Sequence, residues 1–140
     1  MNDGSILLVE DNLDDVELTK RAFARSPFPN EVEVARDGSA AIDRLLAVDA
    51  GPLPALVLLD LKLPKVNGLE VLGRLRADDR TKSLPIVILT SSGEERDLVE
   101  AYRLGANSYL RKPVDFAAFQ ATIDQIGAYW LVLNQTAPGR

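Results

Sequence analysis

The 140-residue sequence contains neither cysteine nor histidine. Without cysteine there are no disulfide bonds and no thiolate chemistry, which fits a reducing compartment. Without histidine the chain cannot form a Ser-His-Asp triad, a Cys-His pair or a histidine-ligated zinc or iron site. Any chemistry must therefore come from carboxylates, hydroxyl groups, lysines or a hard metal ion.

Long apolar runs and an excess of basic charge are also missing. The run Ile6–Val9 is far too short for a signal-peptide core or a membrane span, so we expect a soluble, cytoplasmic protein with no membrane partner. The chain has 16 Lys and Arg against 21 Asp and Glu, for a net charge of −5. A net acidic chain without a basic stripe is not expected to bind nucleic acid.

Short runs of Val, Ile and Leu have the composition of strands buried in a parallel sheet. The clearest runs are Ile6–Val9, Leu56–Leu59 and residues 86–89, and weaker candidates are residues 31–35 and 108–110. Helical patterns separate these runs, so strand and helix alternate five times. This order predicts an α/β protein, a single-domain doubly wound (βα)5 sandwich around a five-stranded parallel sheet.

Apolar residues at helical spacing predict the inward faces of five helices. These residues are Leu13, Val16 and Phe23; Ala40, Ala41, Leu45 and Val48; Leu69, Leu72 and Leu75; Leu98, Val99 and Tyr102; and Phe116, Phe119, Ile123, Ile126 and Trp130. Asn12 or Asp14 would cap the first helix. The last helix is expected to extend to about residue 133, so that residues 1–134 form one domain and residues 135–140 a disordered tail.

Chemically distinctive residues follow the predicted strands at their carboxyl ends. They are Glu10, Asp11, Asp60, Thr90, Ser91 and Lys112. In a parallel sheet these ends lie on one edge, and in the strand order 2-1-3-4-5 the acidic residues converge where the order reverses. Their like charges need a compensating cation, and oxygen ligands without imidazole or thiolate favour Mg²⁺.

Such a crevice can bind a phosphate, with Lys112 and Thr90 as donors, and an aspartate can attack phosphorus to form an aspartyl phosphate. Each residue alone is commonly a helix cap, a solvated turn or a surface charge, but their joint occurrence at several strand ends favours a site. We interpret Asp14 and Asp15 as first-turn helix charges and Ser92 as a helix cap.

Along nearly its whole length the sequence resembles the receiver domain of bacterial two-component response regulators, the CheY-like family. The matching segments are residues 6–12, 58–64, 67–68, 87–91 and 105–113. The resemblance implies a flavodoxin-like fold with strand order 2-1-3-4-5. It selects Asp60, rather than Asp11, as the residue that accepts a phosphoryl group.

The resemblance also implies a role for each matching residue. Asp11 would bind Mg²⁺ (or Mn²⁺) directly, Glu10 would bind it through water, and Asp60 and the backbone carbonyl of Lys62 would be further metal ligands. Glu10 replaces the commoner aspartate, so we expect a change in metal affinity but the same chemistry.

The remaining implied roles concern the phosphoryl group and the response to it. Thr90 and Lys112 would contact the phosphoryl oxygens, and the small Ser91 would leave the site open. Tyr109 would be an aromatic switch that turns inward as Thr90 moves. Lys112–Pro113 would be a cis peptide, which only the proline makes plausible.

The implied function is that of a stand-alone response regulator, not an enzyme beyond its own phosphorylation and slow dephosphorylation. A sensor histidine kinase must supply the phosphohistidine, because this chain has no histidine. Length and the late segment 128–131 are similar to regulators that partner bacterial phytochromes. Such relatives dimerise, and Tyr129, Trp130 and Leu131 would form the homodimer face unless this segment folds back onto its own domain.

Three other functions remain open. A haloacid-dehalogenase-like phosphatase also uses an aspartate nucleophile, but it wants a second acid where Lys62 stands. A flavodoxin-like cofactor module would need a phosphate cradle after the first strand, where the acidic residues 10–15 would repel phosphate. A receiver-like scaffold that is not phosphorylated is disfavoured by the complete set of Asp11, Asp60, Thr90 and Lys112.

Overall fold

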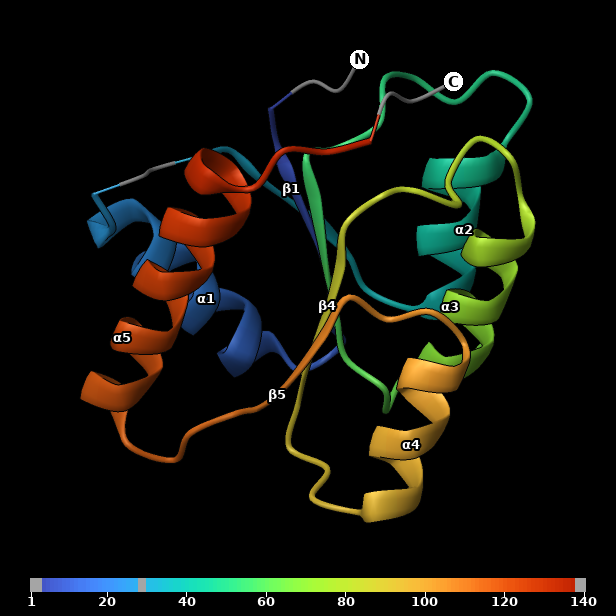
Figure 1. Cartoon of the computed structure of the whole chain (residues 1–140). Helices are drawn as coiled ribbons and strands as arrows, with labels where there is room; N and C mark the ends of the chain where they lie inside the picture. The colour runs from blue at the N-terminus through green and yellow to red at the C-terminus, as the bar shows by residue number, and fades with distance from the viewer. Residues whose placement is uncertain (1–3, 28–29, 138–140) are drawn as a thin grey trace.

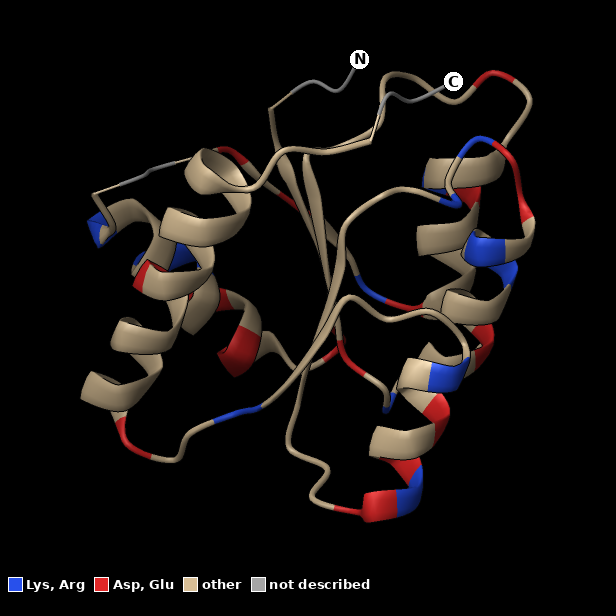
Figure 2. Cartoon of the chain, viewed as in Figure 1, with Lys and Arg blue, Asp and Glu red and all other residues tan. Residues whose placement is uncertain are grey.

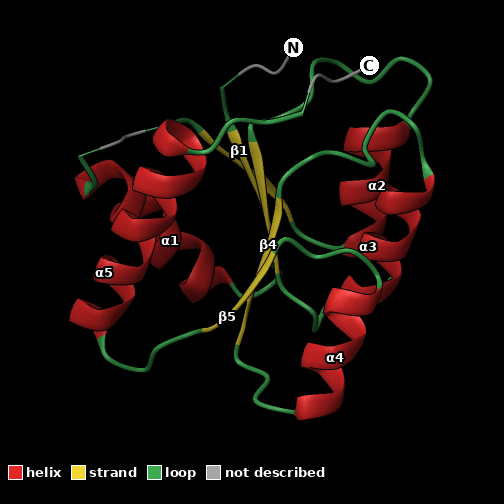
Figure 3. Cartoon of the chain, in the orientation of Figure 1, coloured by secondary structure: helices red, strands yellow, loops and turns green. Residues whose placement is uncertain are grey.

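The computed structural model describes residues 4–27 and 30–137, in which strands and helices alternate along the chain (Figures 1 and 3). The elements are β1 (Ile6–Val9), α1 (Leu13–Arg25), β2 (Val32–Ala35), α2 (Gly38–Leu46), β3 (Leu56–Leu59), α3 (Gly68–Ala77), β4 (Ile86–Thr90), α4 (Glu95–Arg103), β5 (Ser108–Arg111) and α5 (Phe116–Ile126). All strand pairs are parallel, in the order β2-β1-β3-β4-β5. The predicted fold class and strand order are confirmed.

The sheet separates two hydrophobic cores because successive side chains of a strand point to opposite faces. Leu7 and Val9 of β1 pack with α2 and α3, whereas Ile6 and Leu8 pack with α1 and α5. Figure 1 shows this layering, with α1 and α5 on one side of the sheet and α2, α3 and α4 on the other. Burial on both faces explains why the central strands are uninterrupted apolar runs.

Three polar caps begin helices just after the carboxyl edge of the sheet. The side-chain oxygen of Asn12 accepts the backbone N–H of Asp15 at 3.1 Å, so Asn12, not Asp14, caps α1. Asp37 caps α2 and Asn67 caps α3 through equivalent bonds. Each bond satisfies a backbone donor that the helix itself cannot pair.

The apolar stripe of α4 does not lie where the sequence pattern places it. Leu98, Val99 and Tyr102 are 37%, 61% and 49% exposed, and Ala101 is the buried residue of this helix. Spacing identifies a stripe but not whether a neighbouring element covers it, and α4 rests against the sheet through one small side chain. Val48 is likewise exposed, because α2 ends at Leu46.

The last helix continues beyond α5 as η1 (Gly127–Leu133), a π-helical segment. Trp130 and Leu131 are partly buried against the core that α1 and α5 share, whereas Val132 and Leu133 are exposed. Residues 135–137 lie outside any helix or strand, and the rest of the predicted tail, residues 138–140, lies outside the described residues. None of the helices in the described part of the chain is long and apolar enough to span a membrane.

Two matched valine substitutions test this packing. Val71 in α3 is fully buried and Val99 in α4 is 61% exposed. We expect Val71→Ala to lower the free energy of unfolding by about 2 kcal/mol, since it removes two buried carbons and leaves a cavity. Val99→Ala should change it by less than about 0.5 kcal/mol. Urea denaturation measures both, and a comparable loss in the two variants would contradict the observed orientation of α4.

Candidate functional site

The carboxyl edge of the sheet brings together side chains from four strands. Glu10 follows β1, Asp60 follows β3, Thr90 ends β4 and Lys112 follows β5. Figure 2 shows acidic segments meeting at this edge, where β1 leads into α1 and β3 ends. The parallel topology produces this convergence, because every strand presents its carboxyl end on the same side.

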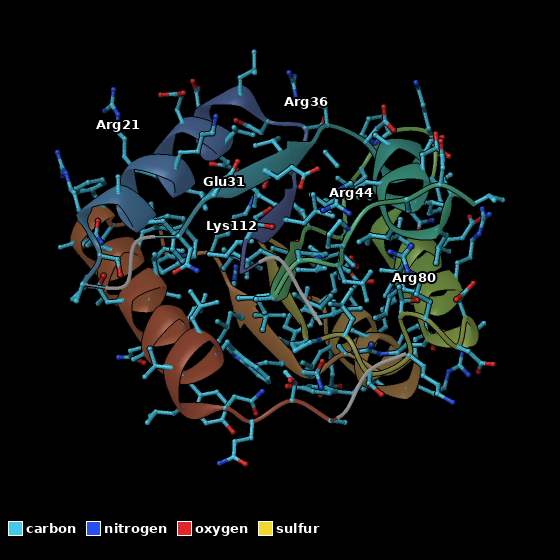
Figure 4. All side chains as sticks on the ribbon, turned by 90° about the horizontal axis from the view of Figure 1, so that it is seen from above. Arg21, Glu31, Arg36, Arg44, Arg80 and Lys112 are labelled. Atoms are coloured by element: carbon cyan, nitrogen blue, oxygen red, sulfur yellow. The ribbon has the colours of Figure 1, made fainter. Side chains whose placement is uncertain are left out.

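Lys112 lies at the centre of the site. Its Nζ is 2.6 Å from Glu10 Oε1 and 2.9 Å from Asp60 Oδ2. A third carboxylate oxygen, Asp15 Oδ2 in the first turn of α1, is also 2.9 Å away. The lysine side chain is only 12% exposed, and Figure 4 shows it within the body of the molecule, whereas Arg21 extends outward. All three donors of the ammonium therefore have a carboxylate partner.

Asp60 is fixed through both of its carboxylate oxygens. Oδ1 accepts the hydroxyl of Thr90 at 2.8 Å and the backbone N–H of Lys62 at 3.2 Å, and Oδ2 accepts Lys112. The side chain is buried, yet it lies beside a hydroxyl donor and an ammonium. This arrangement holds a carboxylate in one orientation with cationic and neutral donors next to it, as an oxygen nucleophile for an anionic group requires.

One ammonium does not fully compensate the carboxylates around it. Burial, reinforced by the nearby charge of Asp60, raises the pKa of Glu10 to about 7 despite the bond from Lys112. Burial opposes the charge of Lys112, but its bonds to Glu10, Asp15 and Asp60 outweigh burial and raise its pKa. Charged, the four groups sum to −2, so the site has a demand for further positive charge.

The site has the donor chemistry of a hard divalent cation but not a finished metal cage. Glu10 and Asp60 supply carboxylate oxygens, and the described residues contain no group of three or more acidic side chains arranged to hold a metal ion. Asp11 is exposed, and its backbone carbonyl accepts Arg36 at 3.3 Å. Oxygen donors and a residual charge of −2 fit Mg²⁺ or Mn²⁺. In this structure the ammonium of Lys112 binds the carboxylate oxygens of Glu10 and Asp60.

Ser92 connects the site to α4. Its backbone N–H donates to Thr90 Oγ1 at 3.3 Å, and its hydroxyl donates to Asp97 in α4 at 2.6 Å. The hydroxyl of Tyr109 donates to the Ser92 carbonyl at 3.1 Å. Ser91, by contrast, is exposed. The structure thus brings Tyr109 to the loop that follows Thr90 and leaves Ser91 facing solvent.

Comparison with known proteins decides the family. The family model described as the response regulator receiver domain matches residues 6–124 of this sequence. This chain belongs to the response regulator receiver family. The probable methanogenesis regulatory protein FilR2 of Methanothrix harundinacea is 46% identical over 136 residues, covering 96% of this chain and 87% of the relative. Response regulator Rcp1 of Synechocystis is 36% identical over 129 residues, covering 90% and 88%.

Solved structures of receivers share the fold of this chain. The Mn²⁺-bound form of Rcp1 has a TM-score of 0.87 at 34% identity, over 96% of this chain and 99% of that one. The phosphorylated cyanobacterial phytochrome response regulator RcpA has a TM-score of 0.88 at 35% identity, over 96% and 99%. The bacteriophytochrome response regulator RtBRR has a TM-score of 0.74 at 50% identity, over 99% and 86%. The chain is thus a phosphorelay response regulator, and the phosphatase and cofactor-module alternatives are excluded.

One expected feature of the receiver site is wrong. The structure has no cis peptide bond among the described residues, so Lys112–Pro113 is trans. Proline reduces the preference for the trans isomer without reversing it, so trans remains the default unless packing demands otherwise. In this trans arrangement the backbone N–H of Lys112 donates to the Thr90 carbonyl at 2.7 Å, and its ammonium reaches the acidic residues.

The sequence reasoning missed two site residues. Asp15 was interpreted as a helix charge and Ser92 as a cap, whereas Asp15 binds Lys112 and Ser92 joins Thr90 to Asp97. Ser92 also accepts the backbone N–H of Glu94, so the cap interpretation described part of its bonding. The sequence alone does not distinguish Asp15 from Asp14, because both lie in the first turn of α1. Only the structure places Asp15 beside Lys112.

The raised pKa of Glu10 predicts pH-dependent stability. Its pKa is about 7 in the folded protein against 4.5 ordinarily. Between these values the folded protein holds a proton that the unfolded chain has released, so the contribution of Glu10 to stability is greatest below pH 4.5 and decreases towards pH 7. In EDTA, wild type should lose on the order of 1 kcal/mol more than Glu10→Gln over this range. Urea denaturation at successive pH values measures this, and parallel curves would contradict it.

Proposed function

We propose that Asp60 accepts a phosphoryl group from a phosphohistidine of a sensor kinase. The observation that carries this proposal is the fixed carboxylate of Asp60, with Thr90 on one oxygen and Lys112 on the other. The existence of RcpA in a phosphorylated form supports the same reaction here. The donor histidine belongs to another protein, because this chain contains none.

The surrounding residues divide the tasks of the transfer. An oxygen of Asp60 forms the new bond to phosphorus as the bond from phosphorus to the donor nitrogen breaks. Lys112 neutralises charge on the transferring group, and the hydroxyl of Thr90 donates to one of its oxygens. The chain therefore assists its own phosphorylation and a slow hydrolysis of the product, and it has no other enzymatic activity in this proposal.

A divalent cation, Mg²⁺ or Mn²⁺, completes the charge balance in this proposal. Glu10, Asp11, Asp60 and the backbone carbonyl of Lys62 would hold it, and the Mn²⁺-bound structure of Rcp1 supports the choice. When bound, it would stabilise negative charge on the phosphoryl oxygens. The residual charge of −2 around Lys112 is the feature of this chain that fits it.

Phosphorylation is read out through the loop after β4. A phosphoryl group on Asp60 offers Thr90 a new acceptor, and movement of Thr90 alters the loop that Tyr109 already contacts. Tyr109 is half-buried against the core beneath α4, so its hydroxyl and ring can follow this loop. Ser91 is exposed and small, and it leaves the approach to Asp60 open.

The partner kinase in this proposal is a bacteriophytochrome, and the two proteins meet in the cytoplasm. RtBRR and the bacteriophytochrome response regulator AtBRR, at 50% and 49% identity, support a light-sensing partner. A histidine kinase draws its phosphoryl group from ATP, which is a cytoplasmic compound. FilR2, at 46% identity, is named as a probable methanogenesis regulatory protein and not as a phytochrome regulator.

Acetyl phosphate with Mg²⁺ tests the phosphoacceptor directly. Intact-mass spectrometry should show wild type gaining about one phosphoryl mass, whereas Asp60→Asn gains none. The Asp11→Asn variant should be labelled much more slowly than wild type, and the label should still be on Asp60. A wild-type protein that stays unmodified, while a control receiver is labelled, would leave only the non-phosphorylated scaffold as an interpretation.

We further propose that the chain forms a homodimer through its C-terminal helical region. Tyr129, Val132 and Leu133 expose 49%, 56% and 68% of their surface, which is more apolar exposure than a short segment normally leaves to water. Trp130 and Leu131 pack partly on their own domain, so they support this face more than they form it. Tyr129 and Trp130 stack edge to face with ring centroids 5.0 Å apart.

A matched pair of charge insertions tests the dimer. Val132→Glu should dissociate a dimer, because it places a charge in an apolar contact. Val48→Glu makes the same substitution at the fully exposed turn after α2 and should leave the dimer intact. Size-exclusion chromatography with light scattering, with and without acetyl phosphate, measures the mass. A monomeric wild type in both conditions would refute this face as an interface.

A further inference from the structure

The three carboxylates around Lys112 differ in what the proposed reaction demands of them. Asp60 becomes the acyl phosphate, so its carboxylate charge is consumed at the reacting atom. In the proposed function Glu10 helps to hold the cation. Asp15 neither reacts nor has a part in the metal site, yet its oxygen lies 2.9 Å from the lysine nitrogen. It is therefore the carboxylate that can keep its bond to Lys112 throughout the reaction.

The position of Asp15 is fixed from both sides along α1. Its backbone N–H donates to the capping oxygen of Asn12 at 3.1 Å, and its carbonyl accepts the hydroxyl of Thr19 at 2.7 Å. The side chain is 35% exposed, against 12% for Lys112, so it approaches the ammonium from the rim of the site. The cap and the helix therefore fix the backbone of Asp15, from which its carboxylate reaches the ammonium.

Lysine needs such an acceptor because its side chain is long and flexible. Confining it costs rotamer entropy, which must be offset by bonds to the ammonium. If Asp60 reacts and Glu10 shares its oxygens with a cation, two of the three bonds to the ammonium change. A bond that persists keeps the ammonium directed at the transferring group.

We propose that Asp15 is a positioning residue for phosphoryl transfer, acting through Lys112. This inference rests on the proposed function, since it presumes that Asp60 is the acceptor. It assigns the EDNLDD segment, residues 10–15, two tasks. Glu10 and Asp11 serve the cation, and Asp15 serves the lysine.

Asp14 provides the matched control. It is the same residue type in the same helical turn, but it is exposed, and none of the bonds found among the described residues involves its carboxylate. Asp14→Asn and Asp15→Asn therefore change the net charge equally, and each removes one negative charge that interacts with the N-terminus of the helix dipole. Only Asp15→Asn weakens the bond to Lys112.

The experiment measures the initial rate of phosphorylation by acetyl phosphate at saturating Mg²⁺, followed by intact mass. We expect Asp15→Asn to be about five-fold slower than wild type and Asp15→Ala slower still, because a charge-assisted bond is weakened and then removed. Asp14→Asn should stay within about two-fold of wild type. Asp15→Glu, which restores the charge on a longer arm, should recover at least half of the wild-type rate.

A double-mutant cycle separates positioning from a general structural effect. In a Lys112→Ala background, Asp15→Ala should cause no further loss of rate, because the residue through which Asp15 acts is gone. An equal loss in both backgrounds, or an Asp15→Asn rate equal to or above that of Asp14→Asn, would overturn the proposal. Failure of wild type to be labelled, or labelling of Asp60→Asn, would instead overturn the assignment of Asp60.

Discussion

The contact of the Lys112 ammonium with three carboxylates is the interaction on which the functional edge of this receiver depends. It joins the end of β5 to the end of β1, although β3 and β4 lie between these strands in the sheet. Removing one partner of a buried ion pair leaves an uncompensated charge, so each of these groups constrains the others. When all four groups are charged the contact has a net charge of −2, and this excess of negative charge favours a divalent cation, which in turn allows an anionic phosphoryl group to bind.

Because the sheet is parallel, the residues of this contact can be located from the sequence. Buried strands must be apolar on both faces, so Ile6–Val9 and Leu56–Leu59 end abruptly where polarity begins. The first polar residues, Glu10 and Asp60, then lie on the shared edge by topology alone. The fold class and the shared edge of Glu10, Asp60, Thr90 and Lys112 could accordingly be predicted from the residues, whereas the strand order was implied by the receiver resemblance. The receiver resemblance was still needed to choose Asp60 over Asp11, because strand ends place both residues but assign neither a reaction.

Other features depend on tertiary packing that periodicity does not encode. The position of Asp15 on α1 brings its carboxylate to Lys112, almost a hundred residues later in the chain. An aspartate in the first turn of a helix has an adequate local explanation without that partner. The stripe of Leu98, Val99 and Tyr102 has helical spacing, but no described element covers it, so the pattern predicted a helix correctly and its buried face wrongly. At Gly68, by contrast, the residue type itself reflects close packing beside the site. Asn67-Gly68 begins α3 where a Cβ on Gly68 would lie 2.3 Å from the Asp60 carbonyl oxygen, so only glycine lets α3 start this close to the site.

The weak attachment of α4 gives the site a route outward. Thr90 Oγ1 donates to Asp60 while accepting the N–H of Ser92, so one hydroxyl belongs to both the site and the following loop. Ser92 passes the connection to Asp97 in the first turn of α4, a helix whose N-cap Glu94 makes no side-chain capping bond. Because α4 buries little beyond Ala101, displacing it costs less free energy than displacing α3, which buries Val71, Leu72 and Leu75. A change in the acceptor of the Thr90 hydroxyl is therefore expected to displace α4 before it displaces the more deeply packed α3.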